Sequence, residues 1–172
     1  MKAIALTFTL SLFAIGLQAQ TFEVPSDVKL EKQEDYSKYE GDIKKCYEWL
    51  MTVPPGEQQR KKDLANQFMI PWVLGSQNVS IEIKPSIVTF METSPEMLSI
   101  FFGAWANYSL SNNYSQDRVK CSKAAINAVI KYYEDHSDKM KKDPNIEECI
   151  LLKEKDKKER TTDFDKYIKD KA

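Results

Sequence analysis

The first twenty residues constrain this chain more than any other segment. They begin with the positive charge of Lys2, continue with an apolar run over residues 3–17, and end near the small residue Ala19. This order is typical of a secretory signal peptide that is removed by cleavage. We therefore predict a signal peptide over residues 1–19, with cleavage after Ala19 or, as the alternative, after Gln20.

The same segment limits the cellular compartments in which the protein is expected. Its apolar run is shorter than a membrane span, which needs about 20 apolar residues. An uncleaved N-terminal anchor is the alternative interpretation, but no stop-transfer segment follows. We expect an exported protein, in the periplasm first and outside the cell second, with no transmembrane segment in the mature chain.

Cleavage leaves one domain of ordinary size. Removal of 19 of the 172 residues leaves 153, which can bury about 70% of the surface of the unfolded chain. The net charge is −1 and becomes −2 when Lys2 is lost. A near-neutral chain lacks the basic field that nucleic acid requires, so nucleic acid is not an expected partner.

Several short stretches carry a resemblance to known proteins. The end of the apolar segment, Leu17-Gln-Ala-Gln20, resembles the signal ends of small exported proteins from Bacteroidetes-type bacteria. The rest resembles an uncharacterised family of small exported α-helical proteins of that group, in residues 35–40, 45–50, 80–83 and 101–105. The resemblance implies a source and a compartment, and it brings no activity with it.

The mature chain divides into three parts. Residues 20–34 are polar and without periodicity, which predicts a flexible lead-in. Residues 35–160 carry apolar positions at three- and four-residue steps, which predicts a single helical domain. Residues 161–172 are rich in charge and predict a solvated tail. The helical spacing of Phe164 and Ile168 would also let a terminal turn dock back on the domain.

The domain is predicted to be all-α, with five to six helices arranged partly as antiparallel pairs. Ser94, Ser115 and Asp143 are the expected caps of the later helices. Pro71 should kink or shorten the second helix. A tetratricopeptide-like stacking of two helix pairs is the finer alternative. The expected helices cover about residues 36–53, 57–74, 85–91, 95–110, 115–136 and 144–152, with one extended connector at 79–83.

Candidate catalytic residues are few. His136 is the only histidine, and we expect it to lie at a helix end. No motif for a nucleophile, a phosphate loop or a metal site is present, so no catalytic residue, cofactor or metal is predicted. A hydrolase that uses two carboxylates is the alternative. Its candidates are Glu48, Glu57, Glu82, Glu92, Glu96, Glu134 and Asp135.

The three cysteines leave the disulfide question open. Cys46, Cys121 and Cys149 are an odd number in an exported chain, so at least one thiol stays free or pairs between molecules. Buried, unreactive thiols are one interpretation. A single disulfide among the three is the other, and the sequence does not choose the pair.

An aromatic-rich helix is the candidate binding element. Either its side chains are buried all round in a central helix, or they form an exposed patch for a partner helix, peptide or ligand. The candidate binding residues are Met69, Trp72, Phe101, Phe102, Trp105 and Tyr108. We expect an exported, non-enzymatic binding or interaction module for an envelope protein or peptide. A hydrolase acting on wall polymer or polysaccharide and a structural envelope component are the alternatives.

Overall fold

The computed structural model describes residues 22–172, which form an all-α fold, as predicted. These residues contain seven α-helices and one 3₁₀ helix and no strand. The predicted signal peptide lies outside the described residues. The helices are α1 (Gln33–Lys38), α2 (Glu40–Thr52), α3 (Gln59–Gly75), η1 (Thr89–Glu92), α4 (Met97–Ser111), α5 (Arg118–Asp135), α6 (Pro144–Glu159) and α7 (Asp163–Lys171).

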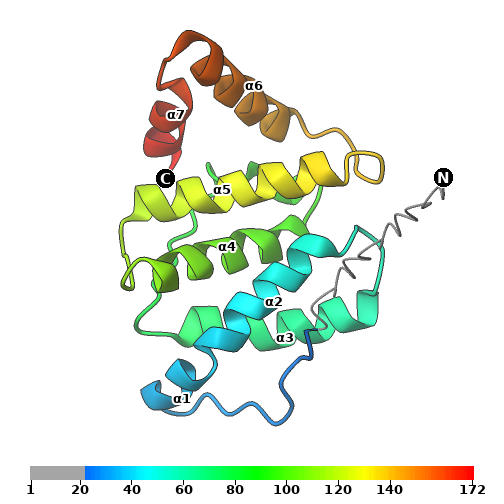
Figure 1. Cartoon of the computed structure of the whole chain (residues 1–172), viewed down its shortest axis with the longest axis vertical. Coiled ribbons are helices and arrows are strands. Elements are labelled where there is room, and N and C mark those ends of the chain that lie inside the picture. Colours follow the sequence, from blue (N-terminus) through cyan, green and yellow to red (C-terminus); the bar gives the residue numbers. More distant parts are fainter. Residues whose placement is uncertain (1–21) are drawn as a thin grey trace, which may run out of the picture.

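Helix α4 is the centre of the fold. It lies between α5 and α3, and α2 crosses it (Figure 1). No residue from Met97 to Ser111 is charged, and ten of its fifteen residues are buried. A helix that is apolar all round is stable only when other elements cover every face. The composition of α4 therefore explains why the other helices assemble around it.

The tetratricopeptide-like pairing is not the arrangement observed. Helix α2 packs mainly on α4, and its contact with the next helix in sequence, α3, is smaller. Gly103 makes the α2–α4 approach possible, because a Cβ atom there would lie 2.9 Å from Cβ of Tyr47. Contacts between helices distant in sequence, rather than repeated neighbouring pairs, hold this part of the fold together.

The number and the bounds of the helices differ from those expected. The expected first helix is divided at Tyr39 into α1 and α2. The expected helix at 85–91 is reduced to the single 3₁₀ turn η1. Helix α3 continues through Pro71 to Gly75, so the proline does not end it early.

The C-terminal residues form a docked helix instead of a charged tail. Asp156 of α6 caps the start of α7: its Oδ1 accepts from Thr161 Oγ1 at 2.6 Å and from Asp163 N at 2.7 Å. Its Oδ2 accepts from Phe164 N at 3.0 Å. Phe164 and Ile168 are buried, and α7 contacts both α5 and α6. The alternative that a terminal turn docks on the domain is therefore correct and extends to a full helix.

The lead-in and the connector are both attached to the helices. Phe22 of the lead-in is buried, with its ring centroid 5.9 Å from that of Trp49. The expected connector at residues 79–83 contains no helix or strand and buries Val79, whereas Ile83 is exposed. Trp105 Nε1 donates to Ser80 O at 3.1 Å, which fixes the connector to α4.

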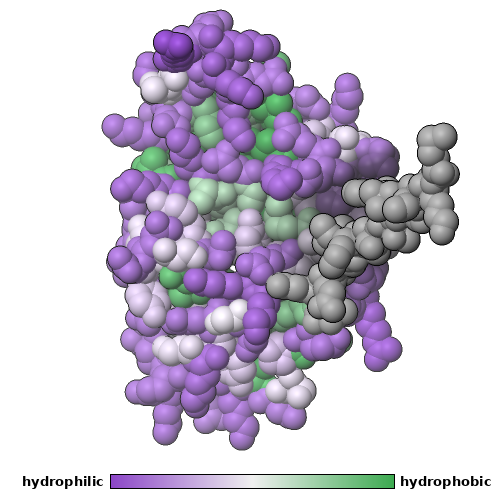
Figure 2. All heavy atoms as spheres, viewed as in Figure 1, coloured by the Kyte–Doolittle hydropathy of each residue, from purple (hydrophilic) through white to green (hydrophobic). Residues whose placement is uncertain are grey.

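The surface is largely polar. Figure 2 shows hydrophilic side chains over most of one face, with smaller apolar patches across its middle. Among residues 22–172, no helix combines the length and the apolar character that crossing a membrane requires.

Candidate functional site

Five of the six predicted binding residues lie in the core, and the sixth, Tyr108, packs against it. Met69, Trp72, Phe101, Phe102 and Trp105 are between 0% and 4% exposed, and Tyr108 is half-buried. Both indole groups donate to backbone carbonyls: Trp72 Nε1 to Tyr36 O at 2.8 Å and Trp105 Nε1 to Ser80 O. Of the two interpretations that the sequence left open, a central buried helix describes these side chains, and they form no exposed patch.

The three cysteines are buried in the helices, and the histidine lies at the end of one. Cys46, Cys121 and Cys149 lie on α2, α5 and α6, and all three are free and buried. Burial raises the pKa of Cys46 to about 12 and that of Cys121 to about 11, so both stay protonated and unreactive near neutral pH. His136 is the C-cap residue of α5, the helix end that we expected for it.

A cavity of about 390 Å³ lies where the loop between α2 and α3 meets α4 and α5. We name it the Lys62 pocket, after the one lysine among its lining residues. The lining residues are Leu50, Gly56, Gln59, Lys62, Asn66, Pro95, Glu96, Ser99, Ile100 and Tyr132. Its walls therefore combine apolar side chains with an ammonium group, two amides, a carboxylate and two hydroxyls.

Lys62 reaches this position because it occupies the inner face of α3. It precedes Ala65 and Met69 at helical spacing, and all three are buried; Lys62 is only 8% exposed. Its Nζ donates to Pro54 O at 2.7 Å and lies 3.5 Å from the Tyr132 hydroxyl. The lysine thus anchors the loop that follows α2.

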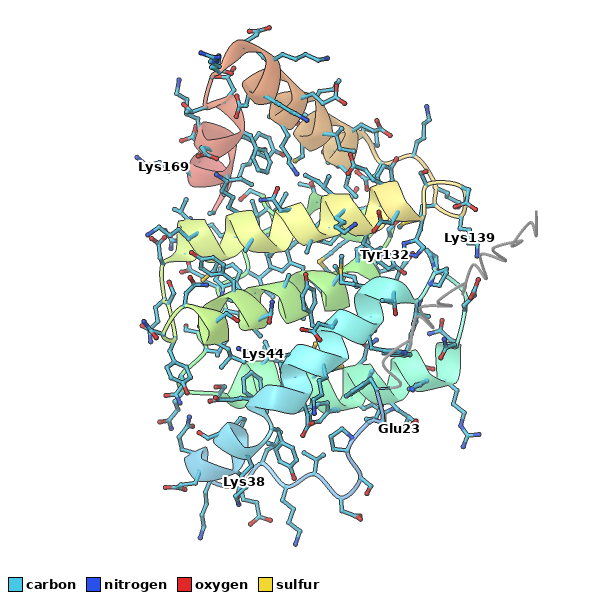
Figure 3. All side chains as sticks on the ribbon, in the orientation of Figure 1. Glu23, Lys38, Lys44, Tyr132, Lys139 and Lys169 are labelled. Atoms are coloured by element: carbon cyan, nitrogen blue, oxygen red, sulfur yellow. The ribbon has the colours of Figure 1, made fainter. Side chains whose placement is uncertain are left out.

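Tyr132 supports the same loop from the other side. It lies in the C-terminal part of α5, near the loop that carries Lys139 (Figure 3). The Tyr132 hydroxyl donates to Val53 O at 2.8 Å, so it accepts from Lys62. Burial, and next the charge of Glu96, raise the pKa of Tyr132 to about 12. The phenol is therefore a neutral hydrogen-bonding group in this site.

The ammonium group of Lys62 is buried without a bonded counter-ion. No carboxylate of residues 22–172 forms an ion pair with it. Burial lowers the pKa of Lys62, and the more distant charges of Glu96 and Glu57 only partly oppose that shift. Glu57 is itself paired with Lys139, whose Nζ lies 2.6 Å from Glu57 Oε1. A charge taken out of water is costly unless it is paired, so the pocket favours an anion beside Lys62.

Asn66 adds an unused acceptor one helical turn from Lys62. Its Oδ1 is shielded from solvent and has no hydrogen-bond partner among residues 22–172. Side chains four residues apart on a helix lie on the same face, so the amide and the ammonium are neighbours. A buried acceptor without a donor costs about 1–3 kcal/mol. Because this oxygen has no accessible surface, it is closed to a molecule in the cavity.

The carboxylates predicted for a hydrolase do not assemble here as a pair. Of the seven candidates, Glu96 alone lines the Lys62 pocket. Glu82 is paired with Arg118 at 2.8 Å, and Asp135 is paired with Lys131 at 2.8 Å. Cleavage of a glycosidic bond normally needs two carboxyl groups on either side of the bond. Within residues 22–172, no group of three His, Cys, Asp or Glu side chains could hold a metal ion.

The sequence interpretation missed five polar residues of this pocket: Gln59, Lys62, Asn66, Ser99 and Tyr132. A signal for two of them was present, because Lys62 and Asn66 fall on the apolar stripe of α3 with Met69. A polar side chain on a buried helical face needs a partner, and that makes it a candidate for a site. The partner itself could not be read from the sequence, since Tyr132 lies 70 residues away.

Comparisons with protein-family models, with curated proteins and with solved structures find nothing that matches this chain.

Proposed function

We propose that this protein is an exported, non-enzymatic binding module of the bacterial cell envelope and that it binds its ligand in the Lys62 pocket. The observation that carries this proposal is a buried ammonium group, without a bonded counter-ion, beside a cavity of about 390 Å³. Small-molecule sites in proteins are concave and enclose about 300–1,000 Å³. The pocket falls in that range.

The arrangement of the polar groups favours binding over catalysis. Lys62 and Tyr132 are both directed to backbone carbonyls, of Pro54 and Val53, and so hold the wall of the pocket in place. A nucleophile needs an adjacent base within hydrogen-bond reach, and Ser99, the one serine of the lining, has no histidine or second carboxylate beside it there. Fixed polar groups around a cavity orient a bound molecule.

The compartment rests on the segment over residues 1–19, which has the layout of a cleaved signal. Expression of the full chain in a Gram-negative host, followed by fractionation and intact mass measurement, tests it. We expect a periplasmic product that begins at Gln20. Cytoplasmic protein of full mass would contradict export and would leave the pocket proposal standing.

A ligand screen by NMR tests the pocket. The purified mature protein is titrated with a library of small polar molecules, and amide shifts are mapped onto the fold. We expect the largest shifts for a bound molecule at Lys62, Asn66 and Ser99. Shifts confined to other surfaces would contradict the pocket, and turnover of the bound molecule would contradict a non-enzymatic role.

A further inference from the structure

The hydrogen bonds of Lys62 leave one of its donors unused. An ammonium group has three N–H donors. One donates to Pro54 O and a second is directed at the Tyr132 hydroxyl, which in turn donates to Val53 O. The third donor and a charge without an ion-pair partner remain, and Lys62 lines the cavity. A charge-assisted hydrogen bond to an anion in the cavity would use both.

Ser99 of α4 provides a second donor. The residue is 7% exposed and lines the same cavity. Its hydroxyl forms no hydrogen bond with another residue of 22–172, yet it is not closed to solvent, in contrast to the unbonded hydroxyls of Ser109 and Ser122. The Ser99 hydroxyl is therefore open to the cavity and can donate to a molecule there.

The depth of the polar groups limits the charge of the ligand. Lys62 and Ser99 are buried, whereas Glu96 and Gln59 are exposed. The two donors thus belong to the inner end of the cavity and the Glu96 carboxylate to its mouth. An anionic group that enters meets the ammonium, and a second negative charge would stay near Glu96, where like charges repel. The cavity therefore favours a ligand with one negative charge, at its inner end.

A carboxylate fits this pair of donors better than a phosphate group does. It carries a single charge on two oxygens, so that one oxygen can accept from an ammonium and the other from a hydroxyl. A phosphate group carries close to two negative charges at neutral pH and is commonly held by backbone N–H groups or several cations. Lys62 is the only cationic group among the lining residues.

We propose that the Lys62 pocket binds a molecule with a single carboxylate group, which accepts hydrogen bonds from Lys62 and Ser99. This inference rests on the proposed function, since it names the ligand class of the same site. The apolar side chains of Leu50 and Ile100 line the same cavity and suit an uncharged carbon chain. Two sources share this chemistry: a free organic acid and the C-terminal carboxylate of a peptide.

NMR titration of the unmodified mature protein tests the ligand class. The probes are butyrate, butyramide, succinate, succinamate, inorganic phosphate and N-acetylalanine. We expect butyrate to bind roughly 10- to 100-fold more tightly than butyramide, because the amide has no charge to pair with the ammonium. Butyrate should also bind more tightly than phosphate, and succinamate more tightly than succinate, whose second charge Glu96 repels. Tighter binding of N-acetylalanine than of butyrate identifies a peptide C-terminus as the source, and the reverse identifies a free acid.

Variants with matched controls locate the carboxylate. Lys62→Met should weaken binding of butyrate by roughly 10- to 100-fold. Lys61→Met removes the same charge from a residue outside the pocket lining and should leave binding unchanged. Ser99→Ala should weaken binding by roughly 3- to 10-fold. Ser109→Ala removes a closed hydroxyl from the same helix and should have no effect on binding. Glu96→Gln should remove the preference for succinamate over succinate.

The inference and the proposed function can fail separately. Equal binding of butyrate and butyramide, tighter binding of phosphate than of butyrate, or equal losses in Lys61→Met and Lys62→Met would overturn the carboxylate. So would the absence of binding by every carboxylate probe at millimolar concentration. An uncharged molecule that shifts the amides of Lys62 and Ser99 in the NMR screen would then still support a binding module. The comparison of butyrate with butyramide uses unmodified protein, so it stands even if Lys62→Met does not fold.

Discussion

Lys62, a buried lysine of α3 without an ion-pair partner, makes the free energy of unfolding depend on pH. Burial lowers the pKa of Lys62 from its ordinary value of 10.5. Between the folded and unfolded pKa values, the unfolded chain binds more protons than the folded one. The free energy of unfolding therefore rises with pH through that window. Below the folded pKa, the lysine is charged in both states and its destabilising effect is fully present.

Comparison with Lys62→Met isolates this effect. We expect wild type to gain stability relative to Lys62→Met as the pH rises towards 10.5, in urea unfolding followed by circular dichroism. Exposed pairs such as Lys139–Glu57 have shifts of the opposite sign, but they are common to both proteins and cancel in the difference. A difference that does not change with pH would show that the Lys62 ammonium is not desolvated.

At the scale of single residues, the sequence showed which side chains were candidates for a role, but it did not show whether they were exposed. It identified the residues of the aromatic helix but could not decide between core and surface. The reason is that Trp105 and Phe101 have the same local spacing in either case, and burial depends on which other helices cover them. The helix-end role of His136 was predictable, because it depends only on its position after α5.

At the scale of elements, two glycines in helices have opposite surroundings. Gly41 in α2 has open space around it, whereas a Cβ atom at Gly103 in α4 would lie 2.9 Å from Cβ of Tyr47. Glycine in a helix costs about 0.5–1 kcal/mol relative to alanine. Overpacking costs about 1–3 kcal/mol. The surroundings therefore decide whether a substitution of each glycine by alanine raises or lowers the free energy of unfolding.

We expect Gly41→Ala to stabilise the protein by about 0.5–1 kcal/mol. Gly103→Ala should destabilise it, because the overpacking against α2 exceeds the gain in helix propensity. Chemical denaturation of the two variants beside wild type measures both. Stabilisation by both substitutions would show that α2 does not approach α4 closely at Gly103.

The starts of the helices show which capping residues could be predicted from the local sequence. The predicted cap at Asp143 is correct: its Oδ1 accepts from Asn145 N at 2.9 Å and from Ile146 N at 3.1 Å. Helix α5 instead starts after Asp117, two residues beyond the expected Ser115. Several cap-forming residues precede α5, so the local sequence left more than one start open. At α6 the proline after Asp143 marks the start, whereas the same pattern at Ser94-Pro95 does not, since the N-cap of α4 is Glu96.

At the scale of the whole molecule, the C-terminal helix completes the packing against α5 and α6. Phe164→Ala should cost about 3–5 kcal/mol, the usual effect of removing a buried phenylalanine. Lys169→Ala, on an exposed position of the same helix (Figure 3), should change stability by about 0.5 kcal/mol or less. Thermal or urea unfolding measures both. Equal, small effects would show that α7 is a free tail, as its charged composition first suggested.

The sequence by itself determined the all-α class and the start of α6. These features depend on spacing over a few residues and on local capping. Tertiary structure decided that α4 is central, that α2 crosses it rather than pairing with α3, and that residues 163–171 dock. It also decided the Lys62 pocket, in which Lys62 and Tyr132 meet across 70 residues of sequence. Such a contact depends on how whole helices pack, and no local pattern encodes it.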